Sequence, residues 1–93
     1  MLITAHVRNI LLDYWDPNSI RNVPKAKGEY DAYIGQILRD VAAGATEERV
    51  ATYLLRIETD ILKQAGDRDR AMFVAHKLLA NDQMTIETQD DED

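Results

Sequence analysis

Residues 30–48, with the sequence YDAYIGQILRDVAAGATEE, decide the fold because they contain a complete helix, its end and the start of the next helix. Large apolar residues recur at spacings of three and four, as on one face of an α-helix: Tyr30, Tyr33, Ile34, Ile37, Leu38 and Val41. Gly44 follows where a left-handed helix end is favoured, and Thr46 is a typical N-cap residue. The stretch therefore predicts two helices joined by a short turn.

The same periodicity continues towards the N-terminus. One face of the first segment carries Ile3, Val7, Ile10, Leu11 and Tyr14. This helix should end at about Trp15, because Pro17 disfavours helical geometry in the residue before it. The segment 17–28 contains both prolines of the chain and several turn-forming residues, so we expect a connecting loop there.

Two further helices are predicted towards the C-terminus. The third helix has the stripe Val50, Tyr53, Leu54, Ile57 and Ile61, and the fourth has Met72, Val74, Ala75, Leu78 and Leu79 facing inward. We expect Gly66 to end the third helix and Asp67 to cap the fourth. The last three helices, joined by short turns, should each run antiparallel to the next.

The charge separates a helical body from a tail. The chain of 93 residues has a net charge of −6. Six acidic residues and no basic residue lie in 82–93, leaving 11 of the 17 acids to balance the 11 bases of 1–81. Helical periodicity also stops after Asn81. We therefore predict an all-α protein, in which residues 1–81 form a compact four-helix domain and residues 82–93 form an acidic, disordered tail. The alternative is a helical dimer in which two chains with thin cores combine their apolar surfaces.

Composition narrows the setting and the chemistry. The chain has no cysteine, which excludes disulfides, thiolate nucleophiles and cysteine-based zinc sites. We find no signal peptide and no apolar run of roughly 20 residues that could cross a bilayer. These features favour a cytoplasmic protein without a membrane partner. No motif of a catalytic, cofactor-binding or metal-binding site is present, so none is predicted.

Four carboxylates near the first loop are the candidates for chemistry. Asp13, Asp16, Glu29 and Asp31 could converge if the second helix starts beside the end of the first. Such a group can perform acid–base catalysis or hold a hard cation. The competing interpretation is structural, because acids stabilise helix N-termini and an Asp-Pro step commonly forms a local turn. We favour the structural interpretation.

The same region supplies a candidate interaction surface. Its members are aromatic, acidic or basic residues at the loop and its borders: Trp15, Asp16, Arg21, Lys25, Lys27 and Tyr30. The aromatic residues could form a binding platform, but we favour a role in fixing the long loop, because aromatic side chains dominate small cores. The few bases, the neutral body and the acidic tail do not favour nucleic-acid binding.

Several of these motifs together resemble a known family. Trp15-Asp16-Pro17, Glu29-Tyr30-Asp31-Ala32-Tyr33 and the segments 44–48 and 53–58 follow the W-D-P … E-Y-D-x-Y pattern of short bacterial all-helical proteins of unknown function. The resemblance covers roughly residues 7–79. It implies a bacterial, cytoplasmic helical domain and carries no activity.

The leading hypothesis is a non-enzymatic protein–protein interaction module. The chain is small, lacks catalytic motifs and has an acidic tail that could steer a basic partner towards it. These features favour an inhibitor or an immunity-type factor. The alternative is a small enzyme or metal-binding protein that uses the four carboxylates. The partner could also be a second copy of this chain, which would form a homodimer.

Overall fold

The computed structural model describes residues 2–20, 22–26 and 28–91, with the surroundings of side chains up to Asp82. Its elements in chain order are α1 (Thr4–Ile10), η1 (Leu11–Trp15), η2 (Pro24–Ala26), α2 (Asp31–Ala42), α3 (Glu47–Arg56), η3 (Ile57–Ile61) and α4 (Arg68–Asp91). η1 and η3 are π-helical turns that continue α1 and α3, and η2 is one 3-10 turn. These described ranges contain no strand. The predicted all-α class with four helices is confirmed.

The turn between α2 and α3 forms as its sequence predicts. Gly44 adopts a φ of +87°, a left-handed conformation that suits glycine. The Thr46 hydroxyl oxygen accepts a hydrogen bond of 3.2 Å from the backbone nitrogen of Arg49. On α2, the buried face is formed by Ile34, Ile37 and Val41. The predicted helix end and N-cap are therefore confirmed.

The first helical segment ends at Trp15, as predicted, but its inner face differs from the prediction. Ile3 and Tyr14 were expected inside, yet they are 45% and 43% exposed. Leu12 and Trp15 are buried instead. Tyr14 lies within η1, where a π-helical turn contains more residues than an α-helical turn and departs from the 3.6-residue period. Ile3 is the N-cap of α1 and has an extended backbone, so it lies outside the helical face.

The third helical segment ends earlier than predicted. η3 ends at Ile61, and residues 62–67 form an irregular link in which Lys63 and Gly66 have φ values of +57° and +87°. Gly66 therefore shapes the link and does not end the helix. Ile61, expected in the core, is 57% exposed. Asp67 caps α4 as predicted, because its Oδ1 accepts a hydrogen bond of 3.0 Å from the Arg70 backbone nitrogen.

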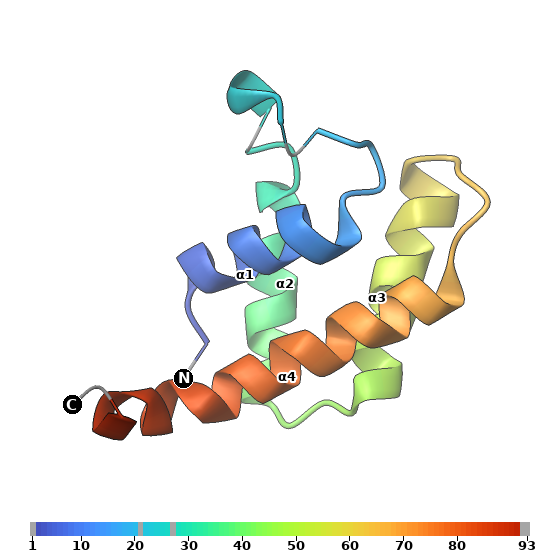
Figure 1. Cartoon of the computed structure of the whole chain (residues 1–93). Helices are drawn as coiled ribbons and strands as arrows, with labels where there is room; N and C mark the ends of the chain where they lie inside the picture. The colour runs from blue at the N-terminus through green and yellow to red at the C-terminus, as the bar shows by residue number, and fades with distance from the viewer. Residues whose placement is uncertain (1, 21, 27, 92–93) are drawn as a thin grey trace.

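The four helices form two crossed pairs. Figure 1 shows α2 and α3 running in opposite directions, as predicted, while α1 and α4 run in opposite directions across them. α4 packs against α3, α1 and η1, and α1 packs against α2. α4 therefore crosses α3 and is not its antiparallel neighbour, which corrects that prediction. The link 62–67, with its two left-handed residues, redirects the chain between them.

The two ends of the helical body meet. The backbone nitrogen of Leu2 donates a hydrogen bond of 2.9 Å to Oδ1 of Asp82. Asp82, placed in the tail from the sequence, thus contacts the body. The remainder of the predicted tail, 83–93, lies outside the residues whose side chains the structure describes. In the described part of the chain, no helix is long and apolar enough to span a bilayer.

Candidate functional site

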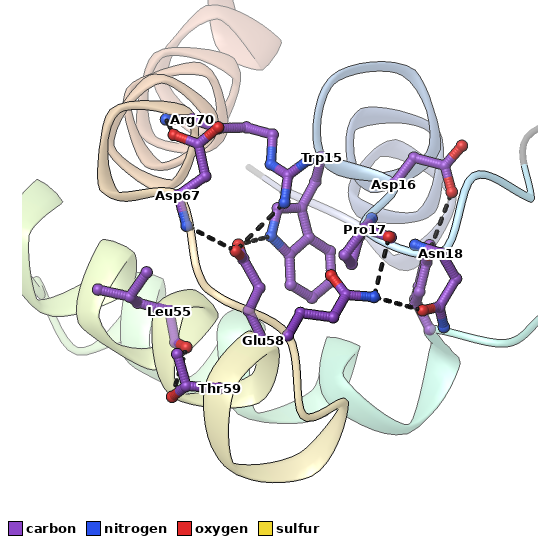
Figure 2. A network of polar contacts seen from close by, with 11 residues as sticks. Trp15, Asp16, Pro17, Asn18, Leu55, Glu58, Thr59, Asp67 and Arg70 are labelled. Atoms are coloured by element: carbon purple, nitrogen blue, oxygen red, sulfur yellow. Dashed lines mark hydrogen bonds and ion pairs between the residues drawn. The ribbon is translucent and has the colours of Figure 1, made fainter.

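A buried carboxylate, that of Glu58, lies where three elements meet. Its side chain is fully buried. Oε2 accepts a hydrogen bond of 2.6 Å from Trp15 Nε1, and Oε1 accepts bonds from the Asp67 backbone nitrogen (2.9 Å) and from Arg70 Nη2 (3.2 Å) (Figure 2). Both oxygens are therefore satisfied, as a buried charge requires.

The Glu58 network is a structural clamp. It joins the end of η1, the turn η3 and the start of α4, which are far apart in sequence. Trp15 is itself enclosed, and its ring contacts those of Tyr30 and Tyr33 at centroid distances of 5.2 and 6.4 Å. Because Glu58 has no exposed surface, its oxygens cannot reach a substrate in this structure. The network therefore fixes these three segments relative to one another.

Sequence reasoning did not single out Glu58 as a core residue. The signal was present, because Glu58 follows Ala51 and Leu54 by seven and four residues, and both are buried on α3. A charged residue that continues a buried stripe requires partners in the core. Those partners come from distant segments, so the sequence alone could not identify them.

A second network holds the loop between η1 and α2. Asp16 Oδ1 accepts hydrogen bonds from the Ile20 backbone nitrogen (2.8 Å) and the Tyr30 hydroxyl (2.9 Å). The Tyr30 hydroxyl oxygen accepts a bond of 2.8 Å from the Asn18 backbone nitrogen. Gln64 also donates to Asn18 Oδ1 at 2.9 Å. Burial raises the pKa of the Tyr30 phenol well above its usual range, so the hydroxyl keeps the proton it donates.

The predicted interaction surface is divided by the structure. Trp15 and Tyr30 are only 1% and 2% exposed, which corrects their assignment to a surface. Their rings fill the space under the loop, as the competing interpretation expected. Asp16 is half-buried in the loop network, whereas Lys25 is exposed. The remaining two residues, Arg21 and Lys27, lie outside the described residues.

The four candidate carboxylates have separate surroundings. Asp31 forms a two-pronged ion pair with Arg8, with both hydrogen bonds at 3.0 Å, while Asp16 belongs to the loop network. Asp13 and Glu29 are exposed. Within the described residues, no group of three or more histidine, aspartate or glutamate side chains could hold a metal ion. The geometry gives the carboxylate alternative no support.

An exposed cluster that the sequence analysis did not anticipate joins η1 and α4. Tyr14 and Phe73, 43% and 48% exposed, contact edge to face with ring centroids 5.7 Å apart. Lys77 Nζ lies 5.0 Å from the Tyr14 centroid and 5.3 Å from that of Phe73. We call these three residues the aromatic patch. An open groove of about 320 Å³ adjoins it, lined by Asn9, Ile10, Asp13, Tyr14, Lys77, Ala80 and Asn81.

Comparison of the chain with protein-family models, with curated proteins and with solved structures finds no significant match. The resemblance to short bacterial proteins therefore stays a prediction. Any function has to be argued from the exposed features of the fold.

Proposed function

We propose that this chain is a non-enzymatic protein–protein interaction module whose helical body binds its partner through the aromatic patch. One observation carries the proposal: Tyr14 and Phe73, from segments far apart in sequence, place two half-exposed rings in contact on the surface. Large apolar side chains gathered on a surface are typical of sites that bind other proteins.

The composition of the patch suits a binding site. Aromatic residues supply much of the energy of protein interfaces, because they bury a large area with few rotatable bonds. Tyr14 and Phe73 restrain each other, and Lys77 interacts with both ring faces at the distances of a cation–π contact. The adjoining groove can accept a side chain of the partner. The rings therefore lose little additional freedom on binding.

The Glu58 clamp holds together the two segments that carry the rings of this site. Tyr14 directly precedes Trp15, whose indole nitrogen is bonded to Glu58. The other end of the clamp, Arg70, lies one helical turn before Phe73 on α4. Both rings are thus attached to segments that the buried network holds together. A pre-formed site binds more tightly than one that must be ordered on binding.

The acidic segment adds a preference for a basic partner. All six excess negative charges lie in residues 82–93, directly after Ala80 and Asn81 of the groove. Such a concentration of charge accelerates encounter with a positively charged surface. We therefore infer an inhibitor or immunity-type factor of the bacterial cytoplasm, in which the patch anchors a partner and the acidic segment steers it. The lack of cysteine supports this setting.

Affinity capture with matched variants tests the proposal. The full chain, the double variant Tyr14→Ala/Phe73→Ala and the control Val23→Ala are each immobilised and exposed to lysate of the source organism. Val23 is a suitable control because it is an exposed apolar residue of the loop, 46% exposed. We expect the full chain and the control to retain the same protein in a defined stoichiometry, with binding to the double variant weaker by at least about tenfold.

Two further results would change the account. Equal retention of that protein by the double variant would contradict a role for the patch. If the protein retained is a second copy of this chain, the homodimer alternative is correct.

The role of the acidic segment is tested by replacing its five acids after Asp82 with the corresponding amides. Slower association, with a reduced dependence on salt, is the expected result.

A further inference from the structure

A second groove lies between α2 and α3, on elements that do not contribute to the aromatic patch. It has a volume of about 430 Å³ and is lined by Gln36, Asp40, Arg49, Thr52, Tyr53 and Arg56. Tyr53 and Arg56 also line a neighbouring hollow of about 290 Å³, which extends to Asp60 and Ile61. We call the two together the arginine groove. It therefore has a cationic part and an apolar end.

The cationic part has an excess of positive charge. Arg49 and Arg56 are exposed, and Arg39 on α2 donates a hydrogen bond of 3.0 Å to Oε1 of Gln36, which lines the groove. Among the residues that the structure describes, none of these three guanidinium groups forms an ion pair. Asp40, which accepts a bond of 2.9 Å from Gln36, is the acid that lines this part. The groove is thus complementary to an anionic ligand.

The spacing of the donors indicates the form of that ligand. Arg49 and Arg56 are seven residues apart on one face of α3, which is roughly 10 Å along the helix axis. Tyr53 lies between them. Burial, helped by the charge of Asp40, raises the pKa of the Tyr53 phenol, so it keeps a proton that it can donate. In an extended peptide in the polyproline II conformation, residues three apart lie on the same side and are also separated by roughly 9 Å.

We propose that the arginine groove binds an extended acidic peptide segment of a partner protein. Two carboxylates of that segment pair with Arg49 and Arg56, and an apolar side chain beyond them packs against Ile61, which is 57% exposed. A nucleic acid fits less well, because its phosphates continue evenly along the whole strand whereas one end of the groove is apolar. The proposal does not depend on the aromatic patch.

Fluorescence anisotropy with defined probes tests this proposal on the full chain. The first probe is a labelled decapeptide with glutamate at every third position and leucine near one end. The second has glutamine in place of each glutamate, and the third is a single-stranded oligonucleotide with the same label. We expect the first probe alone to bind. Its binding should weaken several-fold as ionic strength rises from about 0.01 to 0.15 M, because screening increases.

Charge-reversal variants locate the site. Arg49→Glu and Arg56→Glu should each weaken binding of the acidic probe at least about tenfold, while Arg68→Glu, an equal charge change on α4, should change it less than about twofold. Circular dichroism checks that all three variants stay folded. Equal loss in all three variants, no binding of the acidic probe, or tighter binding of the oligonucleotide would each overturn the proposal. So would a dimer of the full chain that Arg49→Glu dissociates, since the acidic segment of a second copy would then be the occupant.

Discussion

Trp15 donates its indole hydrogen to Glu58 across a distance of 2.6 Å, and both residues belong to π-helical turns, η1 and η3. A π-helical turn rotates the side chains that follow it relative to a continued α-helix. In η1 Trp15 is buried and Tyr14 is exposed; in η3 Glu58 is buried and Ile61 is exposed. Each π-helical turn therefore carries one residue of the buried clamp and one exposed apolar residue that we assign to binding.

The clamp should show strong coupling between its two residues. Trp15→Phe leaves a buried carboxylate oxygen without its donor and should reduce the free energy of unfolding by about 3 kcal/mol. Glu58→Gln should cost about 2 kcal/mol, because in either orientation the amide nitrogen faces a donor: Trp15 on one side, Asp67 and Arg70 on the other. In the double variant the conflict with Trp15 disappears. Its loss should be smaller than the sum of the two by about 1 to 2 kcal/mol.

Urea unfolding of the wild type, the two single variants and the double variant measures this coupling. Strict additivity would mean that the 2.6 Å contact contributes nothing specific to stability.

The two left-handed glycines should differ in their tolerance of alanine. Both have a φ of +87°, which costs a residue with a side chain roughly 1 kcal/mol. A Cβ atom at Gly44 would meet open space, whereas one at Gly66 would lie 2.9 Å from Thr59 Cγ2 and 3.2 Å from Leu55 Cδ1. We expect Gly44→Ala to destabilise by about 1 kcal/mol and Gly66→Ala by about 2 to 4 kcal/mol. Thermal unfolding of the pair gives the comparison, and equal losses would show that the contacts at Gly66 relax freely.

Stability should fall at alkaline pH, partly through Tyr30. Its pKa is raised in the folded protein, chiefly by burial. Above about pH 10 the unfolded chain loses the phenol proton while the folded protein retains it, so stability decreases as pH rises. Tyr30→Phe removes this contribution. At neutral pH the variant should be about 1 kcal/mol less stable than the wild type, because the bonds to Asp16 and Asn18 are lost.

The difference in the free energy of unfolding between the wild type and Tyr30→Phe should then decrease as pH rises above about 10. Urea unfolding across that range measures it. Tyr53, whose pKa is also raised by burial, is present in both proteins and does not affect the difference. A gap that stays constant would contradict a raised pKa at Tyr30.

The sequence predicted the elements that depend on local signals. The stripe of α2, the left-handed Gly44, the Thr46 cap and the Asp67 cap all follow from neighbouring residues, and all are confirmed. The π-helical turns could not be predicted in this way. A strict 3.6-residue period assigned Tyr14 and Ile61 to the core, whereas both lie in π-helical turns and are exposed.

The candidate site could be predicted less well than the fold, because it also depends on contacts between distant segments. The sequence drew attention to the loop region because Trp15, Asp16 and Tyr30 are unusual residues close together, and these residues do interact. Their interaction is internal. The aromatic patch, in contrast, pairs Tyr14 with Phe73, which are 59 residues apart, and this proximity depends on how α4 crosses the body.

The aromatic patch should be separable from stability. Because both rings are almost half exposed, together they bury about as much as one core aromatic residue, and Tyr14→Ala/Phe73→Ala should lower the free energy of unfolding by about 1.5 to 3 kcal/mol. Thermal unfolding of this variant beside Val23→Ala tests the expectation. A loss well above this range would indicate that the patch is part of the core.

Photo-crosslinking from Phe73 shows whether the aromatic patch contacts a partner protein. The photoreactive p-benzoylphenylalanine replaces Phe73 in one preparation and Val23 in another, and each is irradiated in lysate of the source organism. Our account predicts that one protein is crosslinked from position 73, is absent from position 23, and is competed away by the unlabelled wild type but not by Tyr14→Ala/Phe73→Ala. Crosslinking of the same protein from position 23 alone, or competition by the double variant as effective as that by the wild type, would contradict it.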